Sequence, residues 1–192
     1  MFINRVRLGV LSPVFVTTVL LSTHAAAADR AMPMDPNTLF RGRVAEYVAL
    51  HRQCAERLLL RGIDPDPKGG ASFRQALAES IRASRRHAQP GNIFHPAVAR
   101  RILKLVQTDL AARDPRERRA ILAEVPRVLL LRVNDRYPAG EPFATMPPDL
   151  LLRLPTLSPE LQYRFLGRAL ILLDADASLV VDLLQNALPR FP

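Results

Sequence analysis

The chain has 192 residues, with 27 Lys or Arg against 18 Asp or Glu, and its formal net charge is +9. Lys68 and Lys104 are the only lysines, so 25 of the 27 basic residues are arginine. Cys54 is the single cysteine, which excludes an intramolecular disulfide and leaves stability to ordinary packing.

Residues 1–28 have the pattern of a secretory signal peptide. Two arginines precede a mostly apolar run over residues 8–21, and four alanines at 25–28 fit the subsites of a signal peptidase. The run is shorter than the roughly 20 residues that a spanning helix needs, and Pro13 interrupts it. We therefore expect cleavage near Ala28 and export to the periplasm or the cell exterior, with no transmembrane anchor after cleavage. An uncleaved N-terminal anchor is the alternative.

Residues 29–127 predict four helices joined by short loops. Asp35-Pro36 is a helix start, followed by a buried face that includes Tyr47, His51 and Cys54 and ends at Gly62. A capping box of Ser72 and Gln75 predicts a second helix to about residue 88.

The third and fourth helices also have clear start signals. His95-Pro96 opens the third, and Asp114-Pro115 opens the fourth, with Glu117 spaced to bond the N-cap amide. Pro126 ends the fourth helix.

After residue 127 the pattern changes from helical to extended. Residues 128–133 predict a short strand, and residues 134–148 form a proline-rich connection. One helical turn at 149–154 precedes three strands at 161–165, 169–173 and 178–184. Gly167-Arg168 predicts a tight turn with glycine at a positive φ, and residues 174–177 predict the second turn.

These elements predict an α+β fold in which a four-helix N-terminal layer packs on a small C-terminal antiparallel β-meander. We expect one domain over residues 29–192, with a helical half to residue 127 and a Pro-rich connection and meander over 128–192. Between residues 29 and 127 there are 19 basic and 11 acidic residues, a net charge of +8, against −1 for residues 128–192. The basic half is the candidate surface for an anionic partner, and a solvated helical surface, on which acidic residues interleave with the arginines, is the alternative.

Two groups of arginines are candidate sites for an anion or a partner. Arg82, Arg85 and Arg86 lie near the end of the second helix, and Arg113, Arg116, Arg118 and Arg119 lie at the junction of the third and fourth. Arginine near a helix C-terminus also stabilises the helix dipole, which is a structural alternative for the first group. Nucleic acid is not an expected partner, because an exported protein is separated from the nucleic acid inside the cell and no tryptophan is present to stack on bases.

Four residues are candidate metal ligands. His51 and Cys54 share one helix face, and His87 and His95 lie at a helix end and a helix start. The structural alternative is a histidine in a helix seam beside a buried, inert thiol. No cofactor is otherwise expected, and no nucleophile elbow, phosphate-binding loop or zinc-protease motif occurs.

Asp174 and Asp176 follow an apolar strand, a pattern seen at the first motif of haloacid-dehalogenase-like phosphatases and at the start of calcium loops. Only 18 residues follow Asp174, too few for the rest of that catalytic machinery. We interpret these aspartates as turn residues whose side chains bond local amides.

The chain from Val133 onward resembles an uncharacterised family of small exported bacterial proteins, and looser similarity extends into the first helix. The matching residues are Val133-Asn134, Tyr137-Pro138, Thr145-Met146-Pro147-Pro148, Leu150-Leu151, Leu154-Pro155, Tyr163-Arg164-Phe165, Gly167-Arg168, Leu172, Asp174 and Leu179-Val180-Val181-Asp182. The strand–turn–strand ending is distantly similar to periplasmic nickel/cobalt-homeostasis-type proteins. Both resemblances imply an exported location and an α+β architecture, not a mechanism, and with three histidines after residue 28 the chain departs from the histidine-rich pattern of the second group.

The sequence therefore predicts an exported, non-catalytic protein that binds an anionic envelope component or a protein partner through its basic helical surface. The alternative is a periplasmic metal-responsive protein that uses His51, Cys54 and another histidine.

Overall fold

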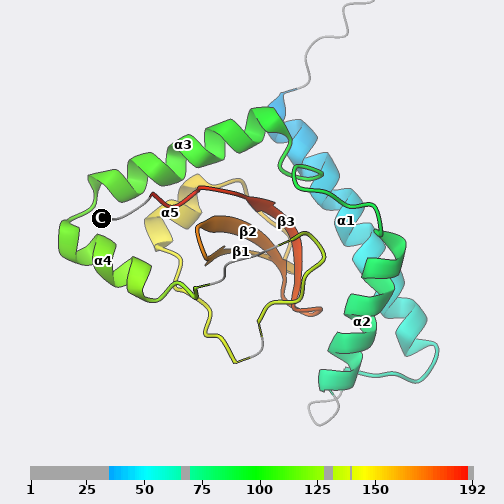
Figure 1. The fold of residues 1–192 in the computed structure, drawn as a ribbon. Helices are drawn as coiled ribbons and strands as arrows, with labels where there is room; N and C mark the ends of the chain where they lie inside the picture. The colour runs from blue at the N-terminus through cyan, green and yellow to red at the C-terminus, as the bar shows by residue number, and fades with distance from the viewer. Residues whose placement is uncertain (1–34, 66–69, 128–131, 139, 190–192) are drawn as a thin grey trace, which may run out of the picture. The chain divides into compact units, whose positions relative to one another are not determined.

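A computed structural model describes residues 35–65, 70–127, 132–138 and 140–189, and Figure 1 shows their helices and strands in chain order. The predicted signal peptide lies outside these residues. The described elements are α1 (Pro36–Leu59), α2 (Gly70–Ser84), α3 (Pro96–Ala112), α4 (Pro115–Ala123), α5 (Pro148–Arg153), β1 (Leu161–Leu166), β2 (Ala169–Asp174) and β3 (Leu179–Leu184). The α+β class is confirmed. The described ranges contain five helices and not a four-helix layer: α1–α4 lie where helices were predicted within residues 29–127, and α5 lies at the helical turn predicted over 149–154.

Proline and a preceding cap begin three of the helices, as predicted. Asp35 caps α1 by accepting from the Thr38 amide, and Asp114 caps α4 by accepting from the Arg116 amide. His95 caps α3. Because proline has a helical φ and no N–H to leave unbonded, each start is stabilised twice.

Two details of the capping predictions are wrong. Helix α2 begins at Gly70 and ends at Ser84, so Ser72 lies inside the helix and residue 88 lies beyond it. Glu117 forms an ion pair with Arg113, where the sequence predicted a bond to the N-cap amide. Arg113 lies four residues before Glu117, at the end of α3. Its guanidinium offers the carboxylate a charged donor, which is a stronger partner than a neutral amide.

The helical packing is centred on α1, which packs against α2 and α3, while α3 contacts α5. The buried side chains of α1 recur every three or four residues and follow the predicted face; they are Phe40, Val44, Tyr47, Val48, His51, Cys54 and Leu58. Helix α4 buries no side chain fully and contributes only part of Ile121 and Leu122 to the core. It is therefore not a full member of a helical layer.

The three strands form the predicted antiparallel meander in the order β1-β2-β3. Leu166 pairs with Ala169 across Gly167-Arg168, and Gly167 has a φ of 56°, as the turn prediction requires. Between β2 and β3 the register shifts, since Leu172 pairs with Asp182 and Leu173 with Val180. One extra residue in β3 is a β-bulge, which turns successive side chains toward one face.

Both faces of the sheet are buried, whereas the sequence predicted one apolar face. Leu170 and Leu172 face the helical core, while Ile171 and Leu173 belong to a second cluster that includes Tyr137. The segment around residue 136 extends along β3, with Tyr137 N–H donating to the Ser178 carbonyl. The proline-rich connection therefore covers the sheet face that the helices leave open.

Most of the predicted strand at 128–133 lies outside the described residues, and the last two residues, Arg132 and Val133, are in no strand. Among the helices of the described ranges, none has the length and hydropathy of a membrane span.

Candidate functional site

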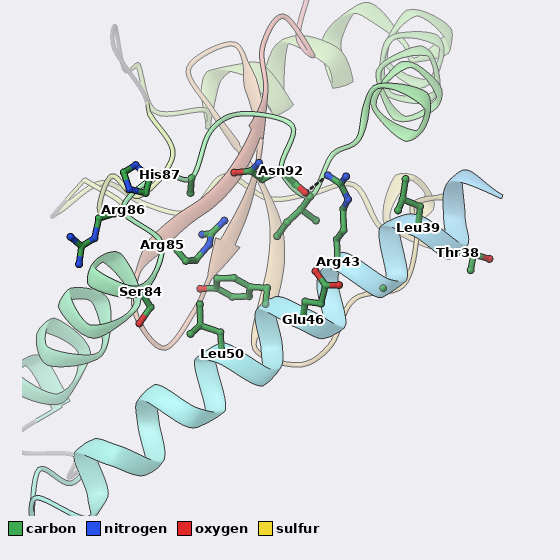
Figure 2. A pocket seen from close by; sticks show the side chains of 14 residues that line it. Thr38, Leu39, Arg43, Glu46, Leu50, Ser84, Arg85, Arg86, His87 and Asn92 are labelled. Atoms are coloured by element: carbon green, nitrogen blue, oxygen red, sulfur yellow. Dashed lines mark hydrogen bonds between the residues drawn. The ribbon is translucent and has the colours of Figure 1, made fainter. Parts of the chain in front are cut away.

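A groove of about 810 Å³ lies beside α1, the end of α2 and the loop that leads to α3 (Figure 2). Basic, apolar and a few neutral polar side chains line it, and Glu46 is the one carboxylate among the lining residues. The lining residues are Thr38, Leu39, Gly42, Arg43, Glu46, Tyr47, Leu50, Ser84, Arg85, Arg86, His87, Ala88, Asn92 and Ile93.

The basic residues of the groove fall into two kinds. Arg43 donates to the carbonyls of Gly91 and Asn92, and Arg85 donates to the Val181 carbonyl at 3.1 Å, so both guanidinium groups brace the fold. Arg86 and His87 are exposed at the end of α2. Among the described residues neither side chain has a hydrogen-bond or ion-pair partner, so both are free to meet a ligand.

The wall of the groove beyond α2 is held in place by Asp182, a fully buried carboxylate on β3. Its Oδ2 accepts from the amides of Ile93 at 2.6 Å and Phe94 at 2.8 Å. Its Oδ1 accepts from the amide of Gly91 at 2.9 Å. The bulge in β3 makes this possible, because strict alternation would have turned Asp182 to the other sheet face.

Beneath the groove, a buried hydrogen-bonded chain joins α1 to the end of β2. Tyr47 donates its hydroxyl to Oδ2 of Asp174 at 2.7 Å, and His51 Nδ1 lies 2.6 Å from the same oxygen. The other oxygen, Oδ1, accepts from the Ala177 amide at 2.9 Å. An ionised carboxylate has no proton to give, so His51 Nδ1 donates in this arrangement.

Two charged side chains contact the outer parts of this chain. His51 Nε2 lies 3.6 Å from Oδ2 of Asp176, whose side chain is 59 % exposed. The Arg85 guanidinium carbon lies 4.9 Å from the centre of the Tyr47 ring, which places a cation on the ring face. The result is a continuous series from Arg85 at the groove to Asp176 at the β2–β3 turn.

The protonation of the chain follows from burial and from these carboxylates. Burial of the ring by itself lowers the pKa of His51, but the hydrogen bond and charge of Asp174, with the charges of Asp176 and Glu160, outweigh burial and raise it above its ordinary value. Burial, together with Asp174, raises the pKa of Tyr47, so the hydroxyl keeps its proton. Burial lowers the pKa of Arg85.

A second cavity, of about 610 Å³, lies on the other side of His51. Arg74 and Asp176 contribute its charged side chains, and Ala55, Leu59 and Phe73 contribute apolar ones. Pro65 and Gly70 also line it and border the undescribed residues 66–69.

The predicted arginine groups are not single binding surfaces. Arg82 donates to the Asn134 carbonyl at 2.7 Å, so with Arg85 it braces the chain and leaves only Arg86 of that group without a partner. In the second group Arg113 pairs with Asp109 at 2.7 Å and also with Glu117. Arg119 donates to the Pro115 carbonyl, and Arg116 and Arg118 have no side-chain partner among the described residues.

The four predicted metal ligands are at separate places. His51 is bonded to Asp174, Cys54 is a buried free thiol, His87 lies in the groove, and His95 caps α3. Within the described ranges no group of three or more His, Cys, Asp or Glu side chains is placed to hold a metal ion. Cys54 is the buried thiol of the structural alternative given above, but the partner of His51 is an aspartate at the end of β2 and does not belong to a helix.

Asp174 bonds a local amide, as the turn interpretation predicted, but its contacts with Tyr47 and His51 are not visible in the local sequence. One sequence feature could have indicated these contacts: Tyr47 and His51 share the buried face of α1, and buried polar side chains need hydrogen-bond partners. An aspartate at the end of an apolar strand was an available partner.

Comparison with protein-family models, with curated proteins and with solved structures found no match to the chain.

Proposed function

We propose that the chain is an exported, non-catalytic protein that binds an anionic envelope component in the groove beside α1. The observation that carries this proposal is the pair Arg86 and His87, exposed and without partners in the described chain, at a groove of about 810 Å³. The excess of basic over acidic residues between 29 and 127 favours approach of an anion to this half of the chain.

The groove has the chemistry for an extended anion that carries some apolar surface. The Arg86 guanidinium offers a planar set of donors that suits phosphate, sulfate and carboxylate groups. His87 adds a donor and, when protonated, a second positive charge. Leu39, Leu50 and Ile93 provide apolar contact beside these groups.

The groove is also held open before any ligand arrives. Asp182 fixes the amides of Gly91, Ile93 and Phe94, and Arg43 fixes two carbonyls of the same loop from α1. A preformed site loses less conformational entropy on binding than a site that has to order itself.

Binding of dextran sulfate, measured by titration calorimetry at low and high salt with neutral dextran as the control polymer, tests the proposal. We expect salt-sensitive binding that Arg86→Ala weakens about tenfold, in line with the loss of one charge-assisted contact. Arg116→Ala removes the same charge from an exposed position outside the groove and is expected to have little effect.

The Arg82 and Arg85 side chains are unsuitable for this test, because both donate to backbone carbonyls and their removal disturbs the fold. Equal affinities for wild type and Arg86→Ala would contradict the groove as the site. Equal losses in Arg86→Ala and Arg116→Ala would indicate attraction to net charge alone.

A further inference from the structure

Tyr47 and Asp174 connect the groove to the imidazole of His51, a group that can gain or lose a proton. Tyr47 and His51 are one helical turn apart on α1 and share one oxygen of Asp174, at 2.7 and 2.6 Å. Tyr47 lines the groove, whereas His51 lines the cavity on the other side. Tyr47 and His51 bond the same oxygen of Asp174, so only this carboxylate lies between the His51 imidazole and the Tyr47 side chain that lines the groove.

The buried position makes the charge of a protonated His51 effective. Asp174 is fully buried and the His51 side chain is 6 % exposed, so water screens their interaction poorly. Two cationic groups lie near the Asp174 carboxylate. A protonated His51 bonds it directly, and Arg85 lies on the ring face of Tyr47, whose hydroxyl bonds the same carboxylate. Loss of the His51 proton therefore removes one positive charge from this buried chain, so the net positive potential at the groove falls.

The surroundings of His51 favour the proton from several elements. Tyr47 and Arg52 belong to the same helix, Asp174 ends β2, Asp176 lies in the β2–β3 turn, Glu160 precedes β1, and Arg74 of α2 lines the adjacent cavity. Arg52 is paired with Glu160 at 2.7 Å and is thereby neutralised in part. The net surroundings are acidic, because two of the three carboxylates contact the imidazole directly.

We propose that anion binding in the groove is coupled to protonation of His51 through the Tyr47–Asp174 hydrogen bonds, so that the chain binds its partner more tightly at acidic pH. This inference rests on the proposed function, since it names the regulation of the same site. Coupling is reciprocal, and a bound anion equally stabilises the protonated imidazole.

The experiment measures dextran sulfate affinity between about pH 5 and 8 in a His87→Gln background. The substitution removes the histidine that faces the groove directly, and the sulfate esters of the probe stay ionised over this range. We expect the affinity to fall about fivefold as His51 loses its proton, the lower end of common coupling strengths.

Asp176→Asn, added to His87→Gln, removes an exposed carboxylate that raises the pKa of His51 and lies outside the groove. The midpoint of the affinity change is expected to move to lower pH. Asp149→Asn removes an exposed carboxylate on α5 and serves as the matched control with an unchanged midpoint.

Constant affinity across the pH range in His87→Gln overturns the coupling while leaving groove binding intact. An unmoved midpoint in Asp176→Asn also overturns it, because the proton then belongs to another group. Absence of binding at every pH overturns the proposed function, and the coupling with it.

Discussion

Asp182→Asn is the substitution that most directly perturbs the wall of the groove. The Asp182 carboxylate accepts four amides: Gly91 and Leu183 at Oδ1, and Ile93 and Phe94 at Oδ2. Asparagine has the same shape, but its NH₂ group replaces one of the two oxygens and confronts amides that can only donate.

The expected loss of stability follows from this count. Two hydrogen bonds to a charged acceptor are lost, each contributing about 1.5–3 kcal/mol, so the free energy of unfolding should fall by at least about 3 kcal/mol. Asp182 itself and the Ile93 and Phe94 amides are buried, so water offers these groups little replacement. Urea denaturation followed by circular dichroism measures the change, with Asp149→Asn as the exposed control. A change below about 1 kcal/mol in Asp182→Asn would refute the assigned role, since it would match an ordinary surface substitution.

Three further predictions follow from the packing and the titration of the chain. Folding raises the pKa of His51, so the stability that its proton contributes is present below the unfolded pKa of about 6.5 and is lost as pH rises through the folded pKa. Thermal melts should therefore show a melting temperature that falls above about pH 6.5, and His51→Gln should flatten that slope. Arg113→Ala removes the main partner of buried Asp109 and should lower the free energy of unfolding, measured by urea denaturation, by about 1–3 kcal/mol. Arg116→Ala should stay within about 0.5 kcal/mol of wild type, and equal losses in the two variants would contradict the ion-pair assignment. Gly167→Val places a branched side chain at a φ of 56° and should destabilise by about 1–2 kcal/mol, and an unchanged denaturation midpoint would mean that the turn adopts another conformation.

The strands and most helix starts could be predicted from the sequence because their signals are local. Alternation at Tyr163 and Phe165, with glycine at position 167, defines a hairpin without reference to the rest of the chain. Asp114-Pro115 defines a helix start in the same way.

The groove and its supports could not be predicted, because they depend on contacts between distant segments. Asp182 reaches residues 91–94 only because a bulge turns it, and no local pattern specifies that bulge. Asp174 and His51 were each singled out, one as a turn residue and one as a metal ligand, but 123 residues separate them. The arginines near the end of α2 looked equivalent in sequence, and only tertiary contacts distinguish the bracing Arg85 from the exposed Arg86.

An NMR titration of arginine side-chain Nε–Hε resonances with dextran sulfate directly tests whether the groove beside α1 binds an anion. We expect the Arg86 resonance to shift with added polymer while those of Arg116, Arg118 and Arg119 keep their positions. Shifts confined to Arg116, Arg118 and Arg119, or no shift at any arginine, would contradict the assignment of the groove beside α1 as the anion site.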